Sequence, residues 1–474
     1  SIENNRWRLW QGLLTCDPQV LRSAAGTATD REVKAWLTLS ALAASTGRQG
    51  IGWVNGAVRW RQANPHHPAL LIADRLQLPD ALSVDYPRNI ALLLPLSGRT
   101  APAGLAIQNG FMGAYFSTSA ALEEKQTVRV YDVNAEGGAS AAYSAAVADG
   151  AEFVIGPLLR DSVTALANDI LVPVPVLTLN YLPDDVLAPP GLYQFALAPE
   201  DEAASAADRA MADGLSRAVA LVPNNDWGRR VLASFSNEFR ALGGTVLDYR
   251  AYTPGMQDFS NTIEDLMGLT GSVNRYQRLR ANIGGPLQYD PRRRQDSDLI
   301  FLAADAPAGR LLKAQLKFHY SGDLPVYSTS SIYAMDGRPN TDLNGVMFDD
   351  TPWIISPQNW IQQLPALYDK YWPEERRLGR LHAMGFDAYH LIAALFEAHT
   401  ESMPEIDGAT GRLYLDRDGR VHRRLAWAQF QHGEPVALPD TELPTEGPIR
   451  DISGAPEEQA PDSDDTWYEE TPKQ

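Results

Sequence analysis

The first 80 residues carry apolar side chains at intervals of three and four. Trp7, Trp10 and Leu14 form one such series, and a helical pattern over 54–63 stops at Asn64-Pro65, where proline ends a helix. This spacing is typical of amphipathic helices that pack in pairs. We therefore predict an all-α segment over residues 1–85, similar to the last units of a helical repeat array. Since stacked repeats need neighbours, we expect further repeats before Ser1.

From residue 89 the pattern changes to continuous apolar runs of strand length that alternate with helical patterns. The runs occupy 89–96, 127–133, 152–158, 174–180, 218–224, 245–253 and 298–304. Uninterrupted apolar strands separated by helices predict parallel sheets covered on both faces, the α/β class.

The alternation occurs in two successive sets, which predicts two lobes with a cleft between them. We place this two-lobed domain at 86–445. The first lobe is expected from about 88–196 and 327–400, and the second from about 197–326 and 408–440. Residues 446–474 are rich in Pro, Glu and Asp, a composition that cannot bury enough apolar area to offset chain entropy. We predict an acidic disordered tail there.

Charge and cysteine content narrow the function classes. The chain of 474 residues has a formal net charge of −18 and a pI near 4.9, which disfavours nucleic acid as a partner. The single cysteine, Cys16, excludes an internal disulfide and any multi-cysteine metal site. No run of 18 apolar residues occurs, so no membrane span is predicted. Because the chain begins abruptly at Ser1, we interpret it as a mature or trimmed form.

The stretch IGPLLRDS, 155–162, has the pattern of a buried strand that turns into a helix. In open α/β proteins such a turn holds ligands through backbone N–H groups and small hydroxyls. Here Gly156 is followed by Leu158, Leu159 and Arg160, and burying a carboxylate against leucines is costly. An amino-acid clamp is therefore disfavoured. For Arg160 we weigh pairing with an anion against a structural salt bridge, and we favour the salt bridge.

Other candidates for the cleft follow the ends of predicted strands, where ligands of open sheets bind. They are Ser97, Arg99, Thr178, Asn180, Tyr181, Asn225, Asp226 and Trp227. The alternative, which we favour, is that they are turn and helix-capping residues, since Ser, Asn and Asp make local hydrogen bonds.

An arginine-rich insertion spans 271–298, with six arginines against three aspartates. Long irregular insertions are more often functional than idle. Arg292, Arg293 and Arg294 could pair with carboxylates of an acidic partner. Equally, they could form a solvated loop or pair with Asp296 and Asp298. Loop aromatics such as Trp353 and Trp360 could anchor an interface, although such residues more often belong to a core.

Catalytic and metal motifs are missing from the sequence. It contains no GxSxG, Walker or HExxH pattern. His382, Asp387 and His390 lie along an apolar helical pattern, and we interpret them as packing and surface residues. We predict no enzymatic activity, no cofactor and no metal.

Several segments resemble known proteins. Ser97-Gly98 after the first strand, Gly156-Pro157 before a helix and Pro175-Val176-Leu177 entering a strand are similar to the type I periplasmic solute-binding fold over about 88–440. More specific segments resemble the LpoA family of outer-membrane lipoproteins that activate class A penicillin-binding proteins. These segments are GPLL (156–159), VLTLN (176–180), FALAPEDEA (195–203), PRRRQD with Asp298, SGDLPVYSTS (321–330), AMGFDAYHL (383–391) and GATGRLYLDRDGRVHRRLAWAQF (408–430).

This resemblance implies a tetratricopeptide-like helical segment followed by a two-lobed periplasmic-binding-protein-like domain. It also implies a non-enzymatic periplasmic protein, anchored in the outer membrane by an N-terminal lipid that this chain lacks. Such a protein binds a bifunctional, class A penicillin-binding protein and stimulates peptidoglycan cross-linking. The alternative is a periplasmic solute-binding protein that delivers an amino acid or similar small molecule to a transporter.

Overall fold

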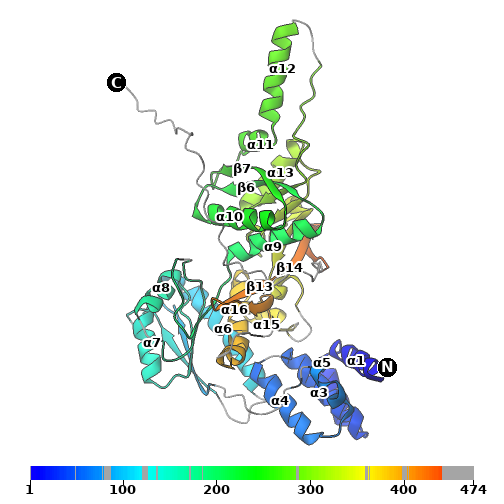
Figure 1. Ribbon diagram of the computed structural model, residues 1–474, viewed down its shortest axis with the longest axis vertical. Coiled ribbons are helices and arrows are strands. Elements are labelled where there is room, and N and C mark those ends of the chain that lie inside the picture. Colours follow the sequence, from blue (N-terminus) through cyan, green and yellow to red (C-terminus); the bar gives the residue numbers. More distant parts are fainter. Residues whose placement is uncertain are drawn as a thin grey trace. The chain divides into compact units, whose positions relative to one another are not determined.

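The computed structural model describes residues 2–439 (Figure 1), apart from residues 49, 77, 79–86, 120–125, 135–136, 170–171, 184, 284–287, 358–360, 362, 398–402 and 404. The acidic tail predicted at 446–474 and the Trp360 candidate lie outside the described residues. The same is true of most of the junction around residue 85.

The N-terminal segment is helical, as its apolar spacing predicts. Its elements are α1 (Ile2–Leu14), α2 (Pro18–Thr27), α3 (Arg31–Thr46), α4 (Gly50–Ala63), the 3-10 helix η1 (Pro68–Ile72) and α5 (Ala73–Leu76). Asp30 caps α3 by accepting a hydrogen bond from the Val33 amide. Trp10, Trp36 and Trp60 are buried at the centre of the helix pack.

The first lobe is built on an eight-stranded sheet. Its strands are β1 (Asn89–Leu94), β2 (Thr127–Asp132), β3 (Phe153–Ile155), β4 (Val176–Thr178), β5 (Leu192–Phe195), β11 (Ile406–Asp407), β12 (Arg412–Leu415) and β13 (Arg420–Arg424), in the order β11-β12-β13-β5-β4-β3-β1-β2. Its helices are η2 (Gly98–Thr100), α6 (Ala101–Ser119), α7 (Ala139–Ala148), α8 (Arg160–Asp169), α14 (Pro352–Ile355), α15 (Gln363–Tyr371), η5 (Pro373–Leu378) and α16 (Gly379–Glu397).

Strand β1 shows why the apolar runs are continuous. Leu92 and Leu94 pack into the cluster that contains residues of α6 and α16. Ala91 and Leu93 pack on the opposite face, with residues of α7 and α8. Because both faces of the sheet are covered, both sets of alternating side chains are apolar.

The second lobe has a seven-stranded sheet. Its strands are β6 (Arg217–Pro223), β7 (Thr245–Tyr252), β8 (Leu299–Leu302), β9 (Val326–Ser328), β10 (Val346–Asp350), β14 (Ala426–Gln431) and β15 (Glu434–Ala437), in the order β15-β14-β10-β9-β8-β6-β7. Its helices are α9 (Pro199–Ala212), α10 (Asp226–Ala241), α11 (Ser260–Leu266), α12 (Leu269–Ile283), α13 (Ala306–Phe318), η3 (Ser330–Ile332) and η4 (Thr341–Leu343).

The chain passes between the two sheets three times, between β5 and β6, between β10 and β11, and between β13 and β14. Two of the lobe limits drawn from sequence therefore differ from the sheets. Strands β9 and β10 belong to the second sheet, although 327–400 was assigned to the first lobe. Strands β12 and β13 belong to the first sheet, although 408–440 was assigned to the second. An apolar run identifies a strand but not the sheet that it joins, because the pairing partner is distant in sequence.

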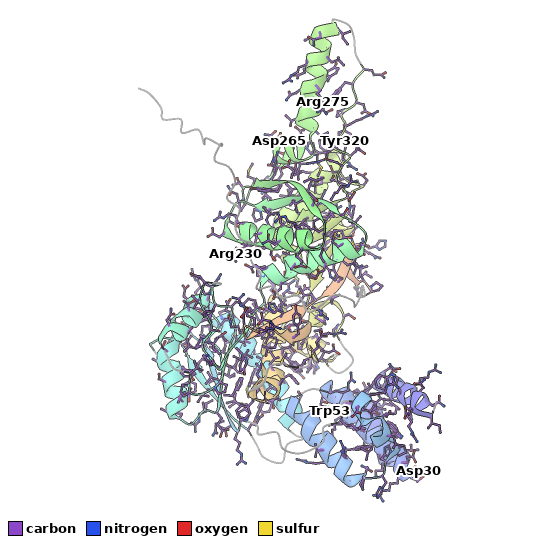
Figure 2. All side chains as sticks on the ribbon, in the orientation of Figure 1. Asp30, Trp53, Arg230, Asp265, Arg275 and Tyr320 are labelled. Atoms are coloured by element: carbon purple, nitrogen blue, oxygen red, sulfur yellow. The ribbon has the colours of Figure 1, made fainter. Side chains whose placement is uncertain are left out.

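The arginine-rich insertion is not irregular throughout. Its first half is helix α12, which Figure 1 shows beyond α11, and Arg275 is labelled on it in Figure 2. The return segment, 288–298, packs against this helix through the stacked rings of Tyr276 and Tyr289, whose centroids are 4.4 Å apart. We call α12 and residues 288–298 the arm. Apolar side chains on α12, Leu279 and Ile283 among them, are exposed.

Candidate functional site

The turn after β3 is shaped by a close approach of two backbones. Gly156 has φ +101°, and a Cβ there would overlap the carbonyl oxygen of Leu93, so only glycine fits. Leu158 is half-buried and packs against the core of the first lobe. Arg160 begins α8 with an exposed side chain, and no ion pair of this guanidinium is found within the described part of the chain. The turn thus presents leucines where a binding protein would present hydroxyls.

The hydroxyl and amide groups after β4 are engaged within the protein. Thr178 is buried, and its Oγ1 donates to the carbonyl oxygens of Asn180 (2.9 Å) and Tyr193 (3.2 Å). The Nδ2 of Asn180 donates to the Leu158 carbonyl oxygen at 3.1 Å. The Tyr181 hydroxyl lies 2.9 Å from the Val421 carbonyl oxygen. These groups hold loops and strands together, so they are occupied before any ligand arrives.

The candidates after β1 and β6 also have local roles. Ser97 is exposed and hydrogen bonds to the Asp132 carboxylate, which lowers the pKa of Asp132. Arg99 is exposed. Asn225 caps α10 by accepting from the Gly228 amide at 2.8 Å.

The first turn of α10 holds the two remaining cleft candidates. Asp226 pairs with Arg229 one turn along the helix. Trp227 is half-buried and packs against the core of the second lobe.

The three arginines of the arm differ in environment. Arg293 is 10% exposed and pairs with Asp323 at 2.5 Å. Arg294 is 20% exposed and pairs with Asp296 at 2.7 Å and Asp248 at 3.7 Å. Arg292 is exposed, and it makes no ion pair with any described residue. The first two therefore fasten the base of the arm, and Arg292 remains available to a partner.

Sequence reasoning did not identify a buried ionic cluster at the crossings between the lobes. We call Glu202, Asp349, Asp350, Arg380 and Arg423 the hinge cluster. Arg380 of α16 donates to both carboxylate oxygens of Asp350, at 2.6 and 2.8 Å. Arg423 of β13 lies 3.8 Å from the Glu202 carboxylate of α9. Each pair joins one lobe to the other.

The carboxylates of the hinge cluster are almost without solvent contact. Asp349 and Asp350 are 0% and 1% exposed, and Glu202 is 6% exposed. Burial and the nearby Glu202 carboxylate raise the pKa of Asp349 well above its usual value. The raised pKa favours the neutral form of Asp349, which lessens the excess of negative charge that the cluster has to bury. The sequence offered one signal, the pair Asp349-Asp350 at the end of an apolar run.

His422 adds a second ionic link between the lobes. It lies between Asp416, 2.8 Å away, and Asp201 of α9, 3.5 Å away. Burial alone would lower the pKa of His422, but hydrogen bonds to Asp201 and Asp416 raise it to about 9. The folded protein therefore holds this proton more tightly than the unfolded chain does.

We expect His422 to make stability depend on pH. Its contribution is complete below the unfolded pKa of about 6.5 and is lost as pH rises through about 9. The loss should be on the order of 3 kcal/mol. Urea unfolding between pH 6 and pH 9.5 measures it, and His422→Gln should flatten the curve. If the free energy of unfolding of that variant changed with pH as steeply as that of the wild type, His422 would not be the cause of the pH dependence.

The two histidines and the aspartate on α16 have separate partners. Asp387 accepts from the amides of Ala409 and Thr410, each at 2.7 Å, and so ties α16 to the loop before β12. His390 contacts the Phe386 carbonyl oxygen, and His382 contacts Glu375. No group of three His, Cys, Asp or Glu side chains suited to a metal occurs within the described ranges.

The chain forms two α/β lobes and passes from one to the other three times. This arrangement defines a type I periplasmic-binding-protein-like fold. The chain belongs to the LppC family, since the model described as "LppC putative lipoprotein" matches residues 1–433. Penicillin-binding protein activator LpoA of Photobacterium profundum is 29% identical over 435 residues, which are 90% of this chain and 70% of that relative. The α/β fold and the family expected from the sequence are confirmed.

Solved structures agree with this assignment. Full-length LpoA of Haemophilus influenzae is 26% identical with a TM-score of 0.58, over 91% of this chain and 73% of that one. Its C-domain, described as a regulator of PBP1A, is 27% identical with a TM-score of 0.57, and the match covers 74% of this chain and 99% of that one. A putative branched-chain amino acid ABC transporter protein of Chromobacterium violaceum is 27% identical with a TM-score of 0.52, and the match covers 72% of this chain and 99% of that one. Among the described helices, none has both the length and the apolar character needed to cross a membrane.

Proposed function

We propose that this protein is a non-enzymatic activator that binds a class A penicillin-binding protein and stimulates peptidoglycan cross-linking. The observation that carries the proposal is the similarity to penicillin-binding protein activators over 90% of the chain, helical segment and both lobes included. The geometry of the turns supports it. Leucines follow β3, and the hydroxyls after β4 bond within the protein.

Activation without catalysis requires a change in the synthase. A bound protein shifts an equilibrium only by its difference in affinity for two states. The activator would therefore contact the active arrangement of the synthase more favourably than the resting one. Ionic links between the lobes support this role, because a scaffold of fixed geometry can discriminate between two partner conformations.

A lipid anchor in the outer membrane is part of the same proposal. Its support is the family description as lipoproteins. Membrane fractionation of cells that make the protein with its natural leader tests it. Recovery with the inner membrane, or entirely in the soluble periplasmic fraction, would contradict the anchor.

The direct test is reconstituted peptidoglycan synthesis by the cognate class A synthase, with and without the 474-residue chain. We expect more cross-linked product at saturating activator, with dose dependence that follows the binding curve. The heat-denatured chain serves as the control. Absence of both binding and stimulation would overturn the proposal.

We propose further that the arm contributes to docking through Arg292. Since Arg293 and Arg294 fasten the arm, only Arg292→Glu leaves the fold intact while reversing an available charge. Against an acidic partner surface it should weaken synthase binding by roughly three- to tenfold, mostly through a slower on-rate. Surface plasmon resonance at two salt concentrations measures this. Arg240→Glu, at an exposed position of α10, is the matched control, and equal effects of both changes would exclude a specific role for Arg292.

The alternative is solute binding, favoured by the similarity to a putative branched-chain amino acid transporter protein. A thermal-shift screen with amino acids, amides and muropeptides distinguishes the two functions. Because the turn after β3 lacks the expected hydroxyls, we expect no saturable stabilisation by amino acids. A saturable shift at micromolar ligand would favour the alternative.

A further inference from the structure

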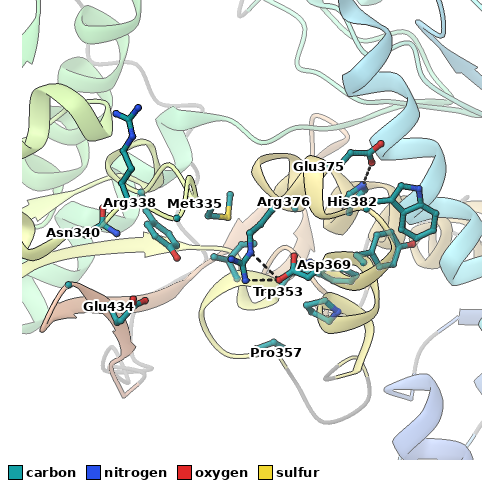
Figure 3. A pocket seen from close by; sticks show the side chains of 18 of the residues that line it. Met335, Arg338, Asn340, Trp353, Pro357, Asp369, Glu375, Arg376, His382 and Glu434 are labelled. Carbon is teal, nitrogen blue, oxygen red and sulfur yellow. Dashed lines mark hydrogen bonds and ion pairs between the residues drawn. The ribbon is translucent and has the colours of Figure 1, made fainter.

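A cavity of about 410 Å³ lies where the two lobes meet. Figure 3 shows its walls, and none of the cleft candidates is among the residues that line it. Trp353 of α14, Tyr368 of α15 and Trp372, which lies between α15 and η5, belong to the first lobe. Tyr333 and Glu434 belong to the second lobe. The volume is within the range of roughly 300–1,000 Å³ that small ligands occupy in proteins.

Aromatic rings form one side of this cavity. The ring centroids of Trp353 and Tyr368 are 5.4 Å apart in an edge-to-face arrangement. Those of Tyr368 and Trp372 are 5.2 Å apart. Trp353 and Tyr368 are buried, whereas Trp372 is 40% exposed. The Tyr368 hydroxyl donates to the Asn109 carbonyl oxygen at 2.7 Å, which fixes the orientation of the central ring.

The charges on the lining are predominantly negative. Two arginines, Arg338 and Arg376, face three carboxylates. Arg376 is committed to Asp369 through contacts of 2.9 and 3.1 Å. Glu375 contacts His382. Because burial lowers the pKa of His382, Glu375 is not paired with a full positive charge. Glu434 makes no ion pair with any residue in the described ranges.

We propose that this cavity binds the alkylammonium group of a short peptide. Aromatic faces attract cations electrostatically, and alkylammonium ligands are recognised in aromatic cages for that reason. Glu434 on the second-lobe side and Glu375 on the first-lobe side give the lining its excess negative charge, and the rings supply apolar contact for the alkyl stem. Arg338 is 73% exposed at the rim and lies 3.6 Å from Asp336, and its remaining guanidinium donors suit the carboxylate of the same peptide.

Binding there would connect the lobes. Tyr333 and Glu434 belong to the second lobe, and the tryptophans belong to the first. Arg380, adjacent to the lining residue Gly379, donates to the Tyr333 carbonyl oxygen at 3.0 Å. The cavity wall is thus continuous with the hinge cluster, and an occupant would stabilise one relation between the lobes.

Titration calorimetry of the 474-residue chain with the peptide Ala-Lys-Ala tests the proposal, with Ala-Gln-Ala as the neutral control peptide. We expect saturable binding of Ala-Lys-Ala with a Kd below about 1 mM, and at least tenfold weaker binding of Ala-Gln-Ala. Glu434→Gln and Trp372→Ala should each weaken binding of Ala-Lys-Ala by about tenfold. Glu434 is exposed, so the thermal midpoint of Glu434→Gln should stay unchanged and report that this variant folds.

Glu405→Gln removes an exposed carboxylate of the first lobe that lies outside the cavity lining, and it should leave binding unchanged. Failure of the wild-type chain to bind Ala-Lys-Ala at millimolar concentration would overturn the proposal. Equal affinity for the two peptides, or full binding by both cavity variants, would overturn it as well. The outcome is independent of synthase activation, because no synthase is present.

Discussion

Arg380→Met is expected to destabilise the folded protein by about 3–5 kcal/mol, since it leaves a buried carboxylate without its counter-charge. Asp350 is 1% exposed and holds the guanidinium through two hydrogen bonds. The same guanidinium donates to the carbonyl oxygens of Ser330 and Tyr333, each at 3.0 Å, and both would lose this partner. Urea unfolding monitored by circular dichroism gives the free energy of unfolding.

Arg376→Met supplies the matched control four residues earlier. Arg376 pairs with Asp369 at 2.9 Å, yet its side chain is 59% exposed, and pairs of this kind contribute at most about 1 kcal/mol. The double change Arg380→Met with Asp350→Asn should recover part of the loss, because the remaining amide carries no charge. Equal destabilisation by the two single changes would mean that burial does not govern the strength of these pairs.

Gly385→Ala is expected to cost about 3 kcal/mol or more, because α6 and α16 pack backbone against backbone. A Cβ at Gly385 would overlap the carbonyl oxygen of Ile107 and would lie 2.9 Å from the amide nitrogen of Phe111. The contact is reciprocal, since a Cβ at Gly110 would overlap the His382 carbonyl oxygen. The helices must separate to admit a methyl group, which opens the core of the first lobe. Thermal unfolding by calorimetry measures the loss.

Gly12→Ala is the control for this change. Gly12 lies in α1, and nothing stands within 4 Å of the Cβ that alanine would add. Alanine should therefore stabilise the helix by roughly 0.5–1 kcal/mol. If Gly385→Ala were as well tolerated as Gly12→Ala, the two long helices would have to be more loosely packed than the structure has them.

The strands were predictable because burial on both faces leaves a continuous apolar signature, as in β1. The sheet to which each strand belongs was not predictable, because β10 pairs with β9 on one side and with β14, which is distant in sequence, on the other. The arm was located by its charge, but its helix was not predicted. Arginine-rich sequence does not distinguish a solvated helix from a loop. The contact that fastens the helix, Tyr276 on Tyr289, joins the two halves of the segment and leaves no local pattern in the sequence.

The hinge cluster was the least predictable feature. Asp350 and Arg380 are separated by 30 positions, and each is unremarkable in its own segment. Asp350 ends an apolar run, as many turn residues do, and Arg380 begins a helix. Only the fold brings them to the same crossing. The candidates read from strand ends were located at their turns, where most of them serve as caps and loop braces.

The three passages of the chain between the sheets restrict how this protein can be dissected genetically. A fragment that stops after β5 lacks β11, β12 and β13, of which β13 pairs directly with β5. A fragment covering β6 to β10 lacks β14 and β15, and so exposes an edge of β10. Neither fragment contains a complete sheet, so loss of activity on deletion would report misfolding rather than the position of a binding surface. Point substitutions are therefore the informative designs.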